Sequence, residues 1–140
     1  MKIYYREKSG GIEILRCFGI EGRVEIPGMI DDKLVISAAP YAFSSHMDEK
    51  EDLKNASLWE VSDGLEFGRE EHVLAGNDVE EIVFPYTLKE IGRYIFYGCG
   101  NLKKLEFSDS LMQIGCGAFT GCHALEKLTV HMRQGKKSGV

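Results

Sequence analysis

Short runs of alternating apolar and polar residues recur in the second half of the chain. Ile82 and Phe84 flank one such polar or exposed position, and Leu105 and Phe107 flank another. This period of two predicts β-strands that bury one face. A strand of about three to five residues cannot bury that face alone, so several copies must stack side by side. The pattern therefore predicts a ladder of short parallel strands.

An internal repeat carries this pattern beyond the strands. Residues 79–101 align with residues 102–124 at an offset of 23, and a third copy opens at residue 125 with the letters LEKLTV. The aligned positions carry the same or similar residues, namely Val79 and Leu102, Ile82 and Leu105, Phe84 and Phe107, Leu88 and Leu111, Ile91 and Ile114, Gly92 and Gly115, and Phe96 and Phe119. So many matches at one offset indicate a solenoid in which each copy is one coil.

The residues that follow each strand have predicted roles as well. We expect Leu88, Ile91 and Phe96 to fill the space behind the ladder, with Phe96 stacked on its equivalent in the next coil. Gly92 and Gly115 come where the chain turns, so they serve either a positive φ or a close approach of two backbones.

The repeat unit is similar to a known family. Its characteristic pairs are Phe84-Pro85, Ile91-Gly92, Ile95-Phe96, Gly98-Cys99 and Asn101-Leu102, and again Ile114-Gly115, Ala118-Phe119 and Gly121-Cys122. In this combination they resemble the BspA-like leucine-rich repeats. The resemblance implies a right-handed solenoid with a parallel sheet on one side and an interaction surface in place of catalytic chemistry. Many relatives are secreted and exposed at the cell surface.

The first half of the chain resembles an opening coil of the same kind. Residues 24–27 read Val-Glu-Ile-Pro, a five-residue expansion leads to Val35, and residues 41–43 supply the aromatic position as Tyr-Ala-Phe. Val35 and Phe43 are separated by eight steps, as Leu88 and Phe96 are. The equivalence predicts that residues 23–43 form the first coil, with two alanines, residues 38 and 39, in place of the Ile-Gly pair.

The two ends of the chain differ from the repeats. Residues 2–18 read as two strands joined by Ser9-Gly10-Gly11, which is a good hairpin signal. A hairpin placed there would cover the open apolar face of the first coil. Residues 131–140 are polar, so we expect the third strand to be shielded by a partner, or the chain to be one part of a longer protein.

An acidic segment interrupts the coil between residues 44 and 78. It contains ten acidic and three basic residues, a net charge of −7, which leaves +2 for the rest of a chain whose total is −5. Ser45 and Asp48 predict a capping box for a short helix that ends near Asn55. Trp59, the only tryptophan, either packs the segment onto the solenoid or stands exposed as a binding anchor. We expect an insertion that can be removed without loss of the fold.

Charge and composition exclude several classes of protein. A net charge of −5 argues against a general nucleic-acid binder, and no apolar run is long enough to span a membrane. The N-terminus has no secretory signal. We therefore expect a cytoplasmic protein if Met1 is the natural start, and a cell-surface protein if an export signal precedes this sequence. The four cysteines, Cys17, Cys99, Cys116 and Cys122, are expected to be free thiols.

Motifs for catalysis or metal binding are missing from the sequence. The four histidines show no ligand-like spacing, and Gly115-Cys116-Gly117 is better explained by the repeat than by a dinucleotide-binding loop. No nucleophile elbow, P-loop or paired-carboxylate signature is present. We predict no cofactor and no metal, and an enzyme with a site in the acidic segment is only a remote alternative.

These observations predict a non-enzymatic module that binds a protein or peptide. The fold is a β-rich leucine-rich repeat solenoid with an N-terminal hairpin cap and a partly helical insertion. Its single domain divides into residues 1–22 (cap), 23–43 (first coil), 44–78 (insertion), 79–130 (repeats) and 131–140 (tail). The alternative is an architectural or self-assembling segment of a longer repeat protein, in which the open C-terminal coil docks on a following domain or on a second copy.

Candidate partner contacts come from the insertion and from the solvent side of the sheet. In the sheet, Glu81, Lys104 and Lys127 should form one row, and Val83, Glu106 and Thr129 the next. Rows of mixed charge suit a protein or peptide ligand. The seven candidate residues are Trp59, Glu60, Asp63, Glu81, Lys104, Glu106 and Lys127.

Overall fold

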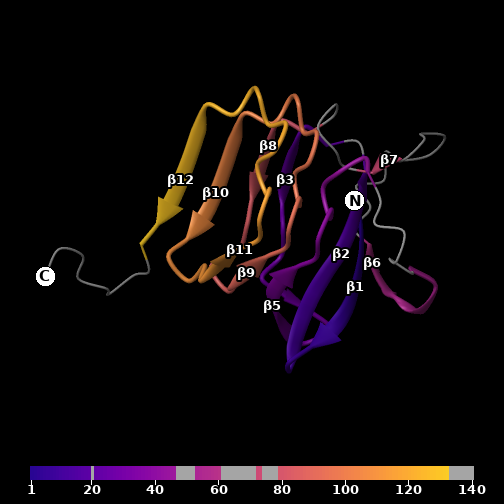
Figure 1. Ribbon diagram of the computed structural model, residues 1–140. Coiled ribbons are helices and arrows are strands. Elements are labelled where there is room, and N and C mark those ends of the chain that lie inside the picture. Colours follow the sequence, from indigo (N-terminus) through magenta and orange to yellow (C-terminus); the bar gives the residue numbers. More distant parts are fainter. Residues whose placement is uncertain (20, 47–52, 61–71, 74–78, 133–140) are drawn as a thin grey trace, which may run out of the picture.

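The computed structural model describes residues 1–19, 21–46, 53–60, 72–73 and 79–132. Strands and turns make up this part of the chain, and it contains no α-helix. Two sheets face each other across an apolar core, with the N-terminal hairpin at one end and the last repeat strand at the other (Figure 1). The predicted β-rich leucine-rich repeat solenoid is confirmed.

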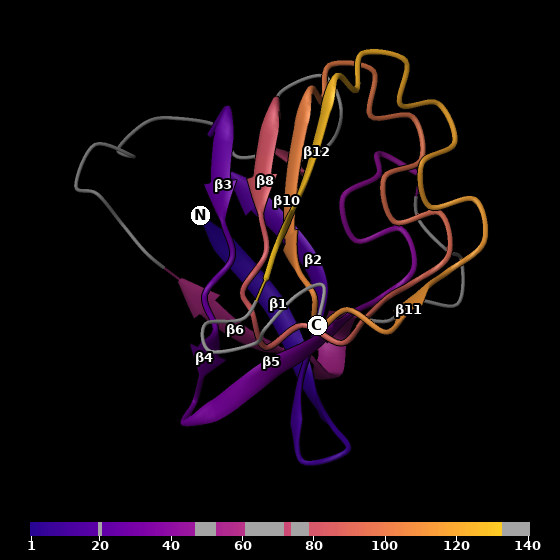
Figure 2. The same ribbon diagram turned by 90° about the vertical axis from the view of Figure 1, so that its left-hand side faces the viewer.

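One sheet, called the repeat sheet here, contains the ladder that the alternating pattern predicts. Its four strands are parallel in the order β12-β10-β8-β3, and they lie side by side in Figure 2. Their bounds are β3 Arg23–Glu25, β8 Glu81–Val83, β10 Lys104–Ser108 and β12 Lys127–His131. Lys104 pairs with both Glu81 and Lys127, so the structure confirms the offset of 23 residues.

The second sheet joins the far side of the coils to the N-terminal hairpin. It runs in the order β11-β9-β5-β2-β1-β6, with β7 paired to β2 and β4 paired to β5. The bounds are β1 Lys2–Lys8, β2 Gly11–Gly19, β4 Met29–Ile30, β5 Lys33–Ala38, β6 Ser57–Glu60, β7 His72–Val73, β9 Glu90–Ile91 and β11 Gln113–Ile114. The five-residue expansion of the first coil is the turn of the β4–β5 hairpin, where Asp31 and Asp32 adopt positive φ.

The N-terminal hairpin is the predicted cap. Strands β1 and β2 are antiparallel, and Ser9 and Gly10 form the turn with φ of 52° and 81°. β2 then pairs in parallel with β5, so the cap extends the sheet of the coils. Eight of the nine residues of β2 are buried. The apolar face of the first coil is therefore closed by the chain itself.

The partly helical insertion is not supported by the structure. In its described part, Leu53–Asn55 form a single 3₁₀ turn, and residues 57–60 form β6. β6 pairs with β1 along four residues, from Lys2 with Glu60 to Tyr5 with Ser57. Residues 47–52, where the capping box was expected to start a helix, lie outside the described residues. The edge of β1 offers backbone partners along a whole strand, and residues Ser57–Glu60 pair with it as an added strand.

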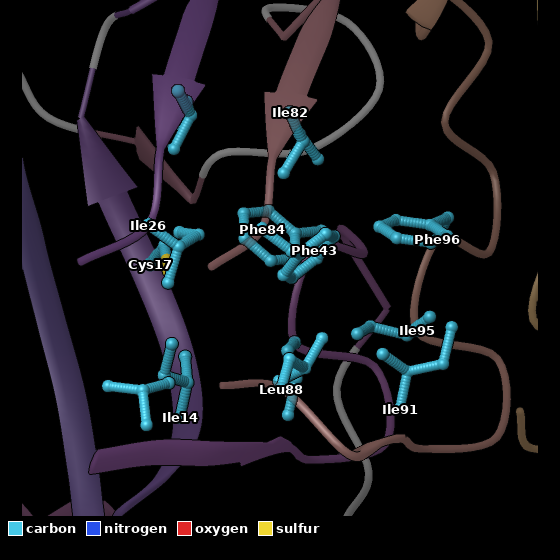
Figure 3. Close-up of a cluster of buried hydrophobic side chains, with 14 of the residues drawn as sticks. Ile14, Cys17, Ile26, Phe43, Ile82, Phe84, Leu88, Ile91, Ile95 and Phe96 are labelled. Carbon is cyan, nitrogen blue, oxygen red and sulfur yellow. The ribbon is translucent and has the colours of Figure 1, made fainter. Parts of the chain in front are cut away.

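Aromatic rings from successive coils form the centre of the core (Figure 3). Phe96 has no exposed surface and lies 6.0 Å from Phe43, 6.0 Å from Phe84 and 5.9 Å from Phe119 between ring centroids. The Phe96 and Phe119 rings are stacked at an interplanar angle of 21°. The predicted stack of core aromatics is therefore present, with Phe119 only partly buried at its C-terminal end.

Gly92 and Gly115 allow successive coils to approach closely. A Cβ atom on Gly92 would lie 2.3 Å from the backbone nitrogen of Pro40, and one on Gly115 would lie 2.2 Å from that of Arg93. Neither glycine has positive φ. Of the two roles left open by the sequence, close approach is the one that the structure assigns.

Candidate interaction surface

The outer face of the repeat sheet carries polar rows in register across the strands. Inward-facing Ile82 and Leu105 are fully buried, so the alternate residues of each strand point to solvent. The first row contains Arg23, Glu81, Lys104 and Lys127, and the second contains Glu25, Val83, Glu106 and Thr129. The two predicted rows are thus present, and β3 extends each of them by one residue.

The acidic side chains of this outer face have arginine or histidine partners within it. Arg23 lies 2.5 Å from Glu25 and 3.5 Å from Glu81, and the hydrogen bond that its guanidinium donates to Glu25 raises the pKa of Arg23. The ring of His131 lies 3.1 Å from Glu106. Within the described residues, no ion pair is formed by Lys104 or Lys127, the neighbours on β10 and β12. The C-terminal half of the face therefore presents a pair of adjacent lysines.

The structure brings together four of the seven candidate contacts. Glu81, Lys104, Glu106 and Lys127 share the outer face of the repeat sheet. Trp59 and Glu60 lie on β6, at the far end of the molecule next to the hairpin (Figure 1). Trp59 is partly buried against the core, in agreement with the packing interpretation, and Glu60 lies 3.9 Å from Lys2. Asp63 lies outside the described residues.

The C-terminal end of the solenoid exposes apolar side chains that are buried elsewhere in the repeat. Leu128 and Val130 are 52% and 53% exposed, whereas their equivalents in the preceding coil, Leu105 and Phe107, are 0% and 3% exposed. Three further apolar residues at this end are exposed, namely Met112, Ile114 and Met132. The end of the stack is thus an apolar surface bordered by the strand edges of β11 and β12.

A groove of about 610 Å³, lined by polar and apolar residues, lies on the other sheet. Its wall contains Glu13, Ser37 and Glu90, which occupy neighbouring strands in register. Lys8 reaches in from the hairpin, with its Nζ 3.0 Å from Glu13 and 2.7 Å from Glu90. The Ser37 hydroxyl lies 3.0 Å from an oxygen of each carboxylate. This pair of carboxylates could not be recognised from the sequence, because Glu13 and Glu90 are far apart in the chain.

Ion pairing governs the chemistry of the groove. The hydrogen bond from Lys8 holds the pKa of the Glu90 carboxyl below its ordinary value, and the same contact raises the pKa of Lys8. Glu13 is 4% exposed and also bonds Arg6, whose Nε lies 2.7 Å from the carboxylate. Glu90 is thus held as a carboxylate at neutral pH. A stored proton for general acid catalysis is not available from it.

The Lys8–Glu90 contact predicts a pH-dependent contribution to stability. A lowered pKa of Glu90 adds stability above the ordinary carboxyl range near 4.5, and this contribution is lost as the pH falls through the lowered value. The raised pKa of Lys8 adds stability that is lost only well above neutral pH. We therefore expect Lys8→Met to destabilise the protein at pH 7 and to have a smaller effect at pH 3. Urea unfolding of both proteins at each pH measures this difference. An effect of equal size at both pH values would contradict the assignment.

An aromatic cluster was also missed by the sequence analysis. Tyr41 and Tyr94 occupy the same repeat position with φ of 60° and 52°, and their rings are stacked at 5.6 Å. Tyr97 and His46 complete the cluster, at 6.5 Å and 5.0 Å from Tyr41. Bulky residues with positive φ are rare. The recurrence of tyrosine at residues 41 and 94 is the sequence signal that could have indicated the stack.

The four cysteines differ in accessibility. Cys17 and Cys99 are buried, Cys122 is half-buried, and Cys116 is exposed; all are free thiols. Burial raises the pKa of Cys17 and Cys122, which makes a thiolate less available. The Cys99 thiol lies 3.0 Å from the carbonyl oxygen of Phe43.

These environments predict one fast-reacting thiol per chain. A water-soluble thiol reagent should label Cys116 rapidly in the native protein, the half-buried Cys122 more slowly, and the buried Cys17 and Cys99 only on the timescale of opening. Cys116→Ser should remove the fast phase, and Cys122→Ser should leave it unchanged. Mass spectrometry of the labelled peptides identifies the reacting residue. Rapid native labelling of Cys99 or Cys122 would show that their burial is wrong.

Two further features concern metals and membranes. Within the described residues, no group of three or more His, Cys, Asp or Glu side chains could hold a metal ion. A search of the same residues finds no helix with the length and apolar character that a membrane crossing requires.

Comparisons with known proteins place the repeats in context. The model of the family described as BspA type leucine rich repeat region (6 copies) matches residues 70–137. Comparison with curated protein sequences finds no match.

Two solved structures resemble the chain. A leucine rich cell surface protein from Faecalibacterium prausnitzii A2-165 matches with a TM-score of 0.60 and 19% identity, over 92% of this chain and 30% of that protein. A leucine rich repeat protein from T. pallidum matches with a TM-score of 0.41 and 16% identity, over 93% of this chain and 83% of that one. This chain thus spans less than a third of the length of the F. prausnitzii protein. At this level of identity, the first likeness supports the fold alone.

Proposed function

We propose that this chain, whose residues 70–137 belong to the BspA type leucine-rich repeat family, binds a protein or peptide ligand through the outer face of its repeat sheet. The observation that carries the proposal is the register of that sheet. Side chains from four strands form two ordered rows of charged and neutral groups. Stacked repeats that present such rows make extended binding surfaces. A role in binding, without catalysis, is also consistent with the ion-paired carboxylates of the groove.

The proposal is tested with peptides selected from a random display library on the full chain. Val83 lies at the centre of the outer face, so Val83→Trp should block the second row and lower the affinity for the selected peptides at least ten-fold. Leu34→Trp is the matched control, because Leu34 is an exposed aliphatic residue on β5, in the other sheet. Equal binding by the wild type and by Val83→Trp would refute the outer face as the binding site.

A second candidate is self-association through the C-terminal end. The exposure of Leu128, Val130 and Ile114 favours it, because a covered end would bury these side chains. A mass measurement over a hundred-fold range of concentration tests this candidate. A mass that stays at that of one chain would exclude it over that range.

Two further proposals concern the location of the protein and the acidic segment. If the natural protein carries an export signal, we propose a cell-surface location, because the F. prausnitzii protein of similar fold is a cell surface protein. We also propose that residues 44–78 can be replaced by a five-residue turn with a cooperative fold retained. Because β6 pairs with β1 and β7 with β2, the shortened chain should unfold at a lower urea concentration.

A further inference from the structure

Among the described residues, strand β12 is the last strand of the repeat sheet and has one unpaired edge. Its residues Lys127–His131 pair in parallel with β10, and within the described residues no strand pairs with its other edge. Such an edge presents backbone donors and acceptors for another strand. On the core side of β12, Leu128 and Val130 are half-exposed. An added strand would therefore satisfy backbone groups and cover apolar side chains at the same time.

The lysines beside this edge favour an added strand that carries an acidic residue. In the register of the repeat sheet, Lys104 lies between Glu81 on β8 and Lys127 on β12. Like charges directly opposite on neighbouring strands are unfavourable, and opposite charges are favourable. An acidic residue next to Lys127 would reproduce on the open side the arrangement that Glu81 and Lys104 have within the sheet.

We propose that the open edge of β12 binds an extended peptide from another protein, in which an acidic residue is followed by apolar residues at the next and third positions. The acid would lie beside Lys127 on the outer face, and the apolar residues would cover Leu128 and Val130. Strand β8 has this pattern, with Glu81 followed by Ile82 and Phe84. This inference goes beyond the proposed function, because it assigns a second binding site at the edge of the sheet with its own class of ligand.

A second copy of this chain fits the edge less well. Head-to-tail stacking would place β3 against β12 in the repeat register, with Arg23 beside Lys127. Antiparallel pairing of two β12 strands would bring together residues 127–131, which contain no acid. Neither arrangement offers Lys127 a carboxylate, so charge complementarity favours a different chain.

The test uses a synthetic peptide with the sequence VEEIVFP, that of residues 79–85, blocked at both ends. It is titrated into the full ¹⁵N-labelled chain, and amide shifts should concentrate on β12. A peptide with lysine in place of its second glutamate should bind about two- to five-fold more weakly, as expected for one cross-strand charge pair. Lys127→Glu should reverse that preference. Lys89→Glu makes the same charge change at an exposed residue outside the repeat sheet and should not reverse it.

Backbone pairing is tested separately from charge. Two peptides are compared, one N-methylated at the odd-numbered residues and the other at the even-numbered residues. Only alternate N–H groups of a bound strand point toward β12. One methylated peptide should therefore lose binding and the other should retain it. The inference would be overturned by any one of three results. These are equal binding of the two methylated peptides, amide shifts centred away from β12, and dimerisation through β12 in the absence of peptide. Because Val83 lies two strands from the edge, Val83→Trp should not change binding of this peptide. A failure of the outer face and a failure of the edge are therefore distinguishable.

Discussion

Replacing Phe96 by alanine is expected to lower the free energy of unfolding by about 3–5 kcal/mol. Phe96 has no exposed surface, and its ring contacts Phe43 and Phe84 as well as Phe119 of the next coil. Its removal leaves a cavity between coils that are held apart by their own strands. Because a domain of this size is stable by only about 5–15 kcal/mol, the loss is a large fraction of the total. Urea unfolding followed by circular dichroism measures it.

Two other aromatic residues, which are less buried than Phe96, provide controls for this prediction. Phe119 is only partly buried at the C-terminal end of the stack, so Phe119→Ala should cost less than Phe96→Ala. Tyr86 is 70% exposed, and Tyr86→Ala should leave the unfolding midpoint almost unchanged. If Phe119→Ala melted within a degree or two of the parent protein, the aromatic would contribute no packing and the repeat register would be in doubt.

Replacing Arg16 by methionine is the second change with a large expected effect. Arg16 is fully buried on β2, and its guanidinium donates to the carbonyl oxygens of Tyr41 at 3.1 Å, Ser44 at 2.6 Å and His46 at 3.3 Å. A buried acceptor that loses its partner costs about 1–3 kcal/mol. Because methionine avoids burying a charge, we expect a net loss of about 3 kcal/mol.

A lysine at position 16 tests whether the hydrogen bonds of the Arg16 guanidinium or only its positive charge stabilise the fold. Arg16→Lys should recover little of the loss, because the donors of an ammonium group share one nitrogen, whereas Arg16 reaches the carbonyl groups of residues 41–46 from two separate nitrogens. Arg23→Met on the exposed outer face is the control and should leave the urea midpoint nearly unchanged. The Arg16 variants should also loosen the loop that carries Tyr41 and His46, seen as faster hydrogen exchange there. Full stability of Arg16→Lys would contradict the proposed contacts.

The candidate surface could be predicted in part from the sequence. The row of Glu81, Lys104 and Lys127 followed from the offset of 23 residues, because residues at one repeat position must meet in a parallel ladder. The location of Trp59 and Glu60 did not follow. Local capping signals predicted a helix that ends near Asn55, and they give no indication of the strand that residues Ser57–Glu60 form on the hairpin. No periodicity links residue 59 to residue 3, so their pairing could not be read from the repeat.

By itself, the sequence determined the repeat, the parallel ladder with its register, the hairpin cap and the core stack that contains Phe96. Each of these depends on periodicity or on turn chemistry, which act over short distances and recur in every coil. Only the tertiary structure decided that Arg16 is buried, that Glu13 and Glu90 share one groove, and that β6 extends the sheet at β1. These features join segments outside the repeat register. Their partners are set by which backbone and charged groups the folded coils leave to be satisfied.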